Sequence, residues 1–332
     1  MPIVHCVPSL ALRVEDQGNN VAMRTREVRT PVAAEVARAW EIVSAHLRPT
    51  PLDVNATPAL KLESAQPVGS FKVRGALTAM SLAPAGVDIV TASAGNHGLG
   101  VAYAARLLGR HATVVVPGNA SAAKVSALRG YGVELVEVGT SYDEAEAHAL
   151  RLAEEGAHFL SPYNDPDVIA GQGTIGHELA AQTDGPLTVV CAVGGGGLAA
   201  GLALWASTRS DVRVVGVEAA VSTALSASVR AGGDVEIEIG DSVADGILGN
   251  LERGSVTVGI LAEHVDSLVT VTEDELYTGI RYLVSQRGVV AEGAGAAAVA
   301  ALLAGKVDVT GQAVAVVSGR NIALPTLAKI LA

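Results

Sequence analysis

The stretch LTVVCAVGGGGLAAG, residues 187–201, decides the fold. Its first seven residues form an apolar, β-branched run of the kind found in strands that are buried on both faces of a parallel sheet. Four consecutive glycines follow, and an alanine- and leucine-rich segment comes after them. Glycines at such a place free backbone N–H groups to converge on an anion, and the helix N-terminus favours the same anion. The stretch therefore predicts a strand, a phosphate-binding turn and a helix.

Two other interpretations of this region are open. Residues 187–206 contain no charged residue, but four glycines in the middle would break a membrane-spanning helix. Gly194, Gly196 and Ala199 also fit a G-x-G-x-x-A pattern, and Glu218 ends the next apolar run about twenty residues on, as a dinucleotide-binding fold requires. A nicotinamide-binding oxidoreductase would, however, leave the other motifs of the chain unexplained.

Similar short apolar runs recur between longer helix-forming segments. This alternation predicts an α/β fold in which helices cover mostly parallel sheets. Ser141 with Glu144, and Thr272 with Glu275, are capping boxes that predict helix starts. The acidic face of the helix expected after Ser141 is predicted to be solvated. The predicted strands are 88–93, 112–117, 133–138, 187–193, 212–218, 267–272 and 312–319.

Composition restricts the kind of ligand. The chain has 332 residues, of which 49% are hydrophobic, so a large core is expected. Its net charge of −11, with no cluster of Lys and Arg, argues against nucleic acid and anionic membranes and favours a small-molecule ligand. The two cysteines, Cys6 and Cys191, suit a reducing cytoplasm, and the first seventeen residues lack the pattern of a signal peptide.

Three further motifs combine with the glycine turn. GSFKVRGA, 69–76, places a single lysine, Lys72, at the start of a helix, and TASAGNHGLGVA, 91–102, places Ser93, Asn96 and His97 where a strand gives way to a helix and can bind a carboxylate. VVSGRN, 316–321, ends a third strand at Ser318. A phosphate site, a carboxylate site and one lysine at strand ends are what an amino acid joined to pyridoxal phosphate requires.

With these motifs the sequence resembles the threonine dehydratase and serine racemase family, closer to the threonine dehydratases. These are fold type II pyridoxal-phosphate enzymes, similar to the tryptophan synthase β chain, with two open twisted sheets flanked by helices. Further matching segments support the resemblance, which covers about residues 30–325. They are TPL 50–52, VPGNASAAKVSALRGYGVELV 116–136, DVIAGQGTIGHEL 167–179, GVE 216–218, ADGI 244–247 and AEGAGA 291–296.

The resemblance implies a role for each matching residue. Lys72 would carry the cofactor and act as the base at Cα, with Phe71 beside it. Asn96 would bond the ring oxygen, Ser318 would meet the pyridine nitrogen, and Glu292 would line the pocket. Gly194, Gly195, Gly196, Gly197 and Leu198 would hold the phosphate, and Ser93, Asn96 and His97 the substrate carboxylate.

The resemblance also implies an organisation into domains. Residues 1–84 and 164–332 would form the large cofactor-binding domain, and residues 85–163 a small mobile domain. No motif of the family matches the stretch before about residue 29. A C-terminal regulatory domain is expected to be absent, and a homodimer is expected.

Three positions differ from the family pattern. Ala94 stands where the racemases carry a second serine that returns a proton to Cα, which favours a dehydratase. Ala224 replaces the aspartate that, six residues after Glu218, completes a divalent-cation site, so no metal ligands are predicted. Arg320 replaces a small residue and would lie near the cofactor ring or face solvent.

The predicted activity is a β-elimination that converts a β-hydroxy amino acid, by default L-threonine or L-serine, to a 2-oxo acid and ammonia. The alternatives are a β-replacement synthase, whose carboxylate loop typically has a threonine at the position of His97, an amino acid racemase, and a dehydratase of a specialised hydroxy amino acid such as 3-hydroxyaspartate or an ectoine-derived one. A binding protein without turnover is the non-enzymatic alternative.

Overall fold

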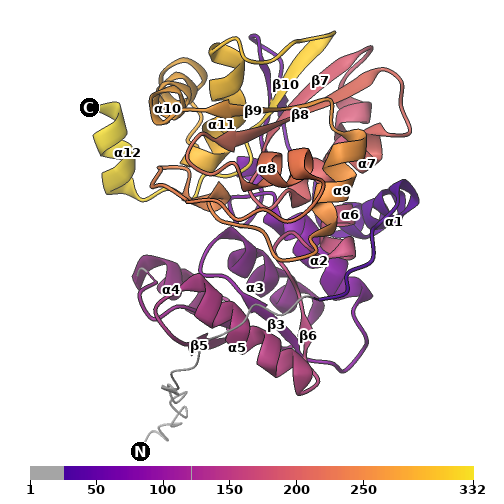
Figure 1. The fold of residues 1–332 in the computed structure, drawn as a ribbon, viewed down its shortest axis with the longest axis vertical. Helices are drawn as coiled ribbons and strands as arrows, with labels where there is room; N and C mark the ends of the chain where they lie inside the picture. Colours follow the sequence, from indigo (N-terminus) through magenta and orange to yellow (C-terminus); the bar gives the residue numbers. More distant parts are fainter. Residues whose placement is uncertain (1–25, 121) are drawn as a thin grey trace, which may run out of the picture.

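The computed structural model of the protein describes residues 26–120 and 122–332 (Figure 1). Cys6, and the stretch before residue 26, lie outside the described residues. The described strands form two sheets, and the elements of the smaller one gather in the lower half of Figure 1. Among the described residues, no helix is both long and apolar enough to cross a membrane.

The larger sheet has the strand order β1-β2-β10-β7-β8-β9. Only the β1–β2 pair is antiparallel, and the other pairs run parallel, with Val190 of β7 opposite Val215 of β8 and Ala315 of β10. Every residue of β7 is buried, which agrees with its uninterrupted apolar sequence. The strands are β1 Leu52–Asp53, β2 Ala59–Lys61, β7 Leu187–Ala192, β8 Val212–Ala219, β9 Ser267–Val271 and β10 Gln312–Val316.

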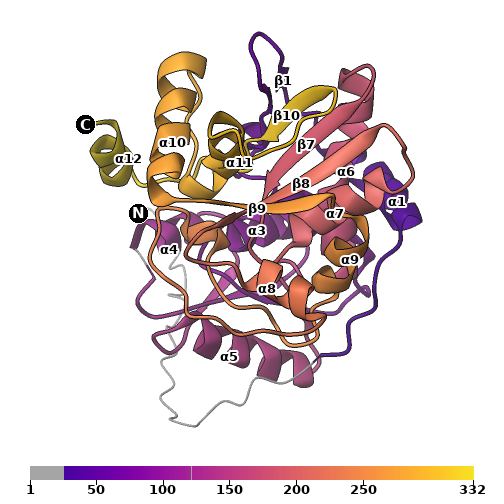
Figure 2. The same cartoon turned by 45° about the horizontal axis from the view of Figure 1, so that its top comes forward.

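Helices cover both faces of the larger sheet (Figure 2). Alternate residues of β7 point to opposite cores: Val189 and Cys191 pack with α1, α6, α7 and α9, whereas Val190 and Ala192 pack with α10, α11 and α12. The helices of the first layer are α1 Ala33–His46, α6 Pro166–Gln182, α7 Gly197–Ala206 and α9 Val256–His264. Those of the second are α10 Glu273–Arg287, α11 Gly293–Leu303 and α12 Leu324–Leu331, and α8 Ala224–Ala231 follows β8.

The smaller sheet is parallel throughout, with the order β5-β4-β3-β6. Val90 and Val115 pack against α5 on one face, whereas Val114 and Val116 pack with α4 and Ala102 of α3 on the other. The strands are β3 Ile89–Ala92, β4 Ala112–Val116, β5 Glu134–Glu137 and β6 His158–Phe159. The helices are α2 Lys72–Leu82, α3 Asn96–Leu108, α4 Ala122–Arg129 and α5 Tyr142–Glu154, and two 3₁₀ turns cover Glu63–Ala65 and Asp245–Ile247.

All seven strands predicted from the sequence are confirmed, as are the capping boxes at Ser141 and Thr272. The strands that the sequence did not predict are β1, β2 and β6, each of two or three residues. Runs this short carry no readable periodicity, so pairing with a neighbouring strand decides whether they are extended.

A buried ionic cluster fixes the start of α2, the helix that opens with Lys72. Arg74, fully buried, donates to both oxygens of Glu63 at 2.7 and 2.8 Å and pairs with Glu178 of α6 at 2.7 Å. Lys61 of β2, also fully buried, pairs with Glu178 at 2.5 Å, and Thr50 donates to Glu63 at 2.6 Å. Two cations and two carboxylates are therefore mutually neutralised where β2, α2 and α6 meet.

Candidate active site

A cavity of about 800 Å³ lies where the ends of strands from both sheets face each other. The structure brings to its wall every site residue that the sequence predicted. They are Phe71, Lys72, Ser93, Asn96, His97, Gly194, Gly195, Gly196, Gly197, Leu198, Glu292 and Ser318.

Lys72 is the first residue of α2, so its side chain leaves the helix at the cavity. Its Nζ donates a hydrogen bond to the carbonyl oxygen of Pro162 at 2.7 Å and lies 5.2 Å from the centroid of the Phe71 ring. Desolvation lowers the pKa of Lys72 to about 8, although the charge of Glu292 opposes the shift. A lysine in this state has a sizeable neutral fraction near neutral pH and can act as a nucleophile or a base.

The turn before α7 has no room for side chains. A Cβ added to Gly195 would lie 2.2 Å from the Tyr163 ring, and one added to Gly194 would lie 2.8 Å from the backbone of Ile247. Gly196 has φ +86°, a left-handed conformation that favours glycine. The backbone of residues 194–197 therefore lines the cavity at the N-terminus of a helix, an arrangement that fits a phosphate group.

A second helix N-terminus faces the same cavity. Helix α3 begins at Asn96, and no side chain caps its first turn. Ser93, just after β3, accepts a hydrogen bond from the Gly95 N–H at 3.2 Å. The free N–H groups of the first turn, with the Ser93 hydroxyl, suit the α-carboxylate of an amino acid.

Asn96 is held from two sides by residues of other segments. Its amide Nδ2 donates to Glu292 Oε1 at 2.6 Å, and its Oδ1 accepts from Asn321 Nδ2 at 2.6 Å. These bonds tie the start of α3 to the start of α11, which Glu292 precedes. The amide of Asn96 is therefore fixed between α3, which packs on the smaller sheet, and α11, which packs on the larger sheet.

His97 is 2% exposed, and its imidazole faces inward. Nε2 lies 3.2 Å from the carbonyl oxygen of Leu160, so Nε2 carries the proton and Nδ1 is the acceptor. Burial, and then the charge of Lys72, lowers the pKa of His97 to about 3, which keeps the ring neutral. Nδ1 has no hydrogen-bond partner among the described residues. The donor that His97 can offer a carboxylate is thus its backbone N–H.

Glu292 and Ser318 also line the cavity. Ser318, 3% exposed, donates to the Ala294 carbonyl at 3.4 Å, a long bond that leaves the hydroxyl available to another partner. Burial raises the pKa of Glu292 to about 7, against the hydrogen bond from Asn96. Arg320 is exposed and donates to the carbonyl oxygen of Ser64. It does not line the cavity.

Sequence reasoning missed an acidic part of the wall. The acidic face of α5 was predicted to be solvated, and this is wrong for Glu146, which is 8% exposed and lines the cavity with Tyr142. The Tyr142 hydroxyl donates to Glu146 Oε1 at 2.9 Å. A tyrosine and a glutamate four residues apart on one helix face were the available signal, but only the tertiary packing turns that face inward.

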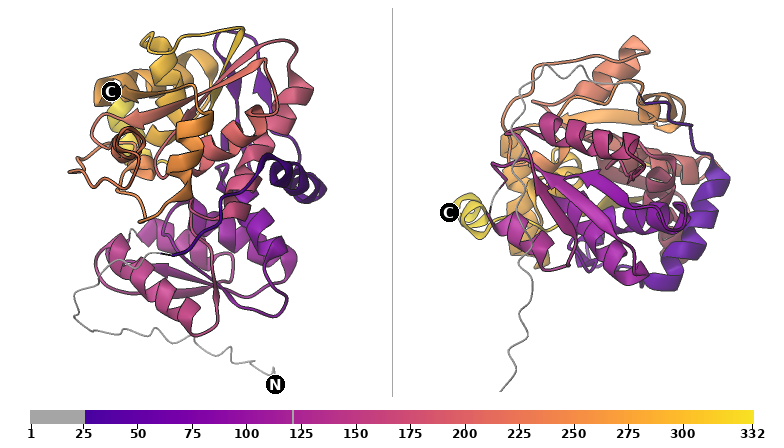
Figure 3. Two further views of the ribbon diagram at one scale, coloured as in Figure 1. Left: turned by 45° about the vertical axis from the view of Figure 1, so that its right-hand side comes forward. Right: turned by 90° about the horizontal axis from the view of Figure 1, so that it is seen from below.

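Glu252 also lines the cavity, and surrounding donors satisfy its carboxylate. It accepts from Ser161 at 2.6 Å, from Asn164 Nδ2 at 2.8 Å and from Arg26 at 2.9 Å. Arg26 precedes α1, and its guanidinium lies 4.8 Å from the centroid of the Phe159 ring of β6. The segment before α1 runs along the junction of the two halves (Figure 3, left).

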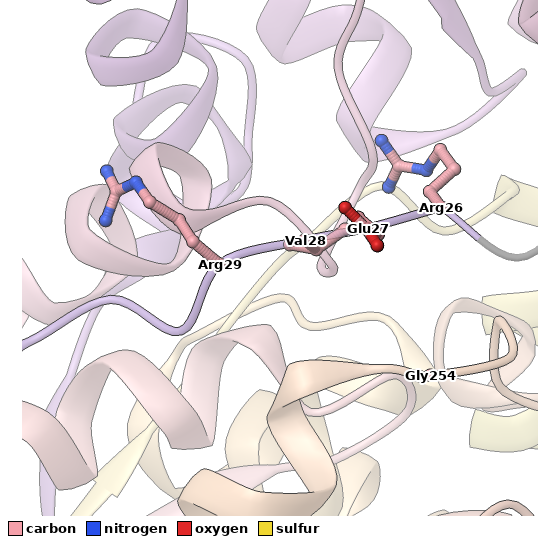
Figure 4. Close-up of a pocket in the computed structure, with 5 residues that line it drawn as sticks. All are labelled: Arg26, Glu27, Val28, Arg29 and Gly254. Atoms are coloured by element: carbon pink, nitrogen blue, oxygen red, sulfur yellow. The ribbon is translucent and has the colours of Figure 1, made fainter.

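A shallower cavity of about 530 Å³ lies beside this segment, lined by Arg26 to Arg29 and by Gly254. The Arg26 and Arg29 side chains extend from the segment, across from Gly254 (Figure 4). Arg26 is paired with Glu252 and Arg29 with Glu35, so both guanidinium groups already have partners. None of the predicted site residues lines this cavity.

Glu218 does not serve a nucleotide in this arrangement. Its carboxylate accepts from the N–H groups of Leu225 at 3.1 Å and Ser226 at 3.2 Å, and from the Ser226 hydroxyl. It thereby caps the start of α8 and does not line the cavity. No group of three or more potential metal ligands occurs within residues 26–120 and 122–332.

Comparisons with known proteins agree on one family. Residues 43–319 match the family model described as pyridoxal-phosphate dependent enzyme. The chain is 42% identical over 278 residues to the L-threonine ammonia-lyase of Thermotoga maritima, covering 82% of this chain and 69% of that one. It is 39% identical over 280 residues to the catabolic L-threonine dehydratase of Escherichia coli K12, covering 82% and 84%.

Solved structures of similar fold come from related enzymes. Threonine deaminase isoform 2 of Solanum lycopersicum superposes with a TM-score of 0.81 at 30% identity, covering 94% of this chain and 98% of that one. Maize serine racemase superposes with a TM-score of 0.82 at 28% identity, covering 91% and 97%.

Proposed function

We propose that this chain, which belongs to the pyridoxal-phosphate dependent enzyme family, is an ammonia-lyase that converts L-threonine or L-serine to a 2-oxo acid and ammonia. The observation that carries the proposal is the position of Lys72. It faces a cavity that has a glycine-lined helix N-terminus for a phosphate and a second uncapped helix N-terminus for a carboxylate.

The residues present fit pyridoxal phosphate. A Cβ on Gly194 or Gly195 would collide with neighbouring atoms, so the glycine turn exposes its backbone N–H groups to the cavity. His97 Nδ1 is a buried polar atom without a hydrogen-bond partner among the described residues, and the Ser318 hydroxyl makes one long hydrogen bond. When bound, the cofactor supplies an electron sink for the charge that develops at Cα. We propose that Lys72 carries it, that residues 194–198 hold its phosphate, and that Phe71, Asn96, Glu292 and Ser318 surround its ring.

Lys72 would also handle the α-proton. Its neutral amine takes the proton from Cα, the bond from Cβ to the hydroxyl oxygen breaks, and the hydroxyl leaves as water with the proton that Nζ had taken up. The first turn of α3, with Ser93, holds the carboxylate so that the Cα–H bond points toward Nζ of Lys72. The enamine that is released takes up water, which yields the 2-oxo acid and ammonia.

Ala94 favours elimination over racemisation. It lines the cavity beside Ser93, and its methyl group can neither donate nor accept a proton. A racemase must return a proton to the face of Cα opposite the lysine, and a methyl group cannot do so. Ser318, a neutral partner for the ring, does not enforce the protonated pyridine nitrogen that long-lived carbanions require.

We further propose that residues 85–163 form a small mobile domain and that the protein acts as a cytoplasmic homodimer. The smaller sheet and α3 to α5 fall within that range, and their link to α11 passes through the Asn96–Glu292 bond. The support for the dimer is the family resemblance. The support for the cytoplasm is the low cysteine content, with Cys191 free and buried.

The test is release of 2-oxo acid and ammonia from a panel of β-hydroxy amino acids, with and without a chelator. Release from L-threonine or L-serine that survives the chelator supports the dehydratase and agrees with the missing aspartate at Ala224. The Lys72→Ala variant must lose both the activity and the visible absorption band of the cofactor. An intact band without release from any panel member would favour a β-replacement reaction instead.

A further inference from the structure

We propose that the part of the cavity wall formed by α5 and residues 236–252 selects a β-hydroxy amino acid whose side chain carries a cationic amine, with Glu146 as the specificity-determining residue. This rests on the proposed function and names the substrate class within it. L-Threonine would then be an accepted substrate but a weaker ligand than its relative with an amine on Cγ.

The charges around the cavity favour a cationic ligand. The turn before α7 and the start of α3 would bind the two anions mainly through backbone N–H groups. The charged side chains of the cavity therefore belong to other parts of its wall. Of the two lysines that line the cavity, Lys72 is reserved for the reaction and Lys124 pairs with Asp245 at 3.2 Å. The carboxylates that line it are Asp143, Glu146, Glu236, Asp245, Glu252 and Glu292.

Several of the cavity carboxylates already have partners. Glu252 is paired with Arg26 and also accepts from Ser161 and Asn164, and Glu292 accepts from Asn96. Glu146, by contrast, accepts a hydrogen bond from the neutral hydroxyl of Tyr142 and pairs with no cation among the described residues. It is therefore the buried cavity carboxylate best placed to pair with a charge on the ligand.

The position of Glu146 is unfavourable for its charged form in the free protein. Burial, and then the nearby charge of Glu252, raises the pKa of Glu146 to about 7, against the hydrogen bond from Tyr142 and the charge of Arg26, which forms its ion pair with Glu252. A carboxylate that is buried next to another carboxylate is stabilised by any cation that enters the site. An ammonium group from the ligand would do so, whereas a carboxylate from the ligand would add a third negative charge.

The substrate geometry agrees with this choice. With the α-carboxylate at the start of α3 and Cα at Lys72, the walls left for the side chain include α5 and residues 236–252. A side chain of two carbons with a terminal amine, as in 2,4-diamino-3-hydroxybutanoate, differs from threonine by one ammonium group. Its isostere with a carboxylate is 3-hydroxyaspartate, which the same wall would reject.

Three ligands without a β-hydroxyl test this without turnover. L-2,4-Diaminobutyrate, L-2-aminobutyrate and L-aspartate have side chains that are cationic, neutral and anionic on a similar frame. Their dissociation constants from the holoenzyme are measured by calorimetry and by the change in the visible absorption band. We expect the cationic ligand to bind about tenfold more tightly than the neutral one, and the anionic ligand to bind most weakly.

The Glu146→Gln variant tests the residue. It keeps the size of the side chain and the hydrogen bond with Tyr142 but removes the charge, so the preference for the cationic over the anionic ligand should fall at least about tenfold. Glu155→Gln is the matched control, because Glu155 is an exposed glutamate at the C-terminal end of the same helix. Its ligand order should equal that of the wild type.

The outcomes separate the two proposals. Equal affinities for the three ligands, or tightest binding of L-aspartate, would overturn the specificity proposal, and so would an unchanged order in Glu146→Gln. Should that variant fail to fold, the wild-type order still decides. If the enzyme turns over threonine but the three ligands do not bind in the predicted order of affinity, this inference alone is refuted. If the ligands bind in that order but no β-hydroxy amino acid is turned over, the proposed elimination is refuted.

Discussion

Replacing Glu178 by glutamine tests whether the buried ionic cluster holds α2, and with it Lys72, in place. In the wild type the Glu178 carboxylate pairs with Lys61 at 2.5 Å and with Arg74 at 2.7 Å, and it accepts from the Thr50 N–H at 2.9 Å. Both cationic side chains are fully buried. The glutamine keeps the shape but leaves two buried cations with Glu63 as the nearest counter-charge.

The expected loss follows from that imbalance. Breaking a buried ion pair by removing one partner typically costs about 3–5 kcal/mol, because it leaves an uncompensated charge. The glutamine amide oxygen can still accept a hydrogen bond from one of the two cations. We therefore expect a loss of stability at the lower end of this range, about 3 kcal/mol. For a chain of this size that corresponds to a fall in Tm of roughly 4 °C.

A second variant separates charge balance from loss of contacts. In Lys61→Met/Glu178→Gln one cation is removed with the anion, and Arg74 with Glu63 remain a neutral pair. The double variant should therefore be more stable than Glu178→Gln alone, by at least about 1 kcal/mol. The control Glu41→Gln, at an exposed position of α1, should change the free energy of unfolding by less than about 0.5 kcal/mol.

The assay is urea unfolding of the apoprotein and holoenzyme, followed by circular dichroism, with cofactor loading measured by visible absorbance. A loss below about 1 kcal/mol in Glu178→Gln, or a double variant that is no more stable than Glu178→Gln, would refute the role given to the cluster.

Three other predictions concern the site itself. The rate at which pyridoxal phosphate links to the apoprotein should rise between pH 6 and 9 with an apparent pKa near 8, because the neutral amine of Lys72 is the nucleophile; a stopped-flow rate that does not change over this range would contradict it. Gly195→Ala should weaken cofactor binding at least about tenfold, since its Cβ would lie 2.2 Å from the Tyr163 ring, whereas Gly259→Ala, in open space, should leave it unchanged in a fluorescence titration. Ala94→Ser should add some racemisation of L-serine, and chiral chromatography that finds no D-serine would count against the role given to that position.

The sequence predicted most of the fold because its strands are continuous apolar runs. The stretch around residues 187–201 alone predicted β7, the glycine turn and α7, and each lies where expected. The missed strands, β1, β2 and β6, owe their extended conformation to the neighbours with which they pair. Local sequence carries no information about such long-range pairing.

The site likewise contains residues that local sequence could predict and residues that it could not. Lys72, the glycine turn and the start of α3 could be predicted because each is a local motif at a strand or helix end. Glu146 could not, because a glutamate on an amphipathic helix has the same local pattern whether the face meets solvent or a cavity. The acceptor role of His97 Nδ1 depends on the Leu160 carbonyl, 63 residues away in sequence, and is visible only in three dimensions.

Incubation of the holoenzyme with L-threonine in deuterium oxide tests the central claim most directly. The account predicts 2-oxobutanoate and ammonia in equal amounts, with one solvent deuterium at C3 of the initial product, measured by proton NMR together with an ammonia assay. L-Serine should likewise give pyruvate. Recovery of both amino acids unchanged except for exchange at Cα, or formation of the D-enantiomers without ammonia, would contradict the proposed elimination.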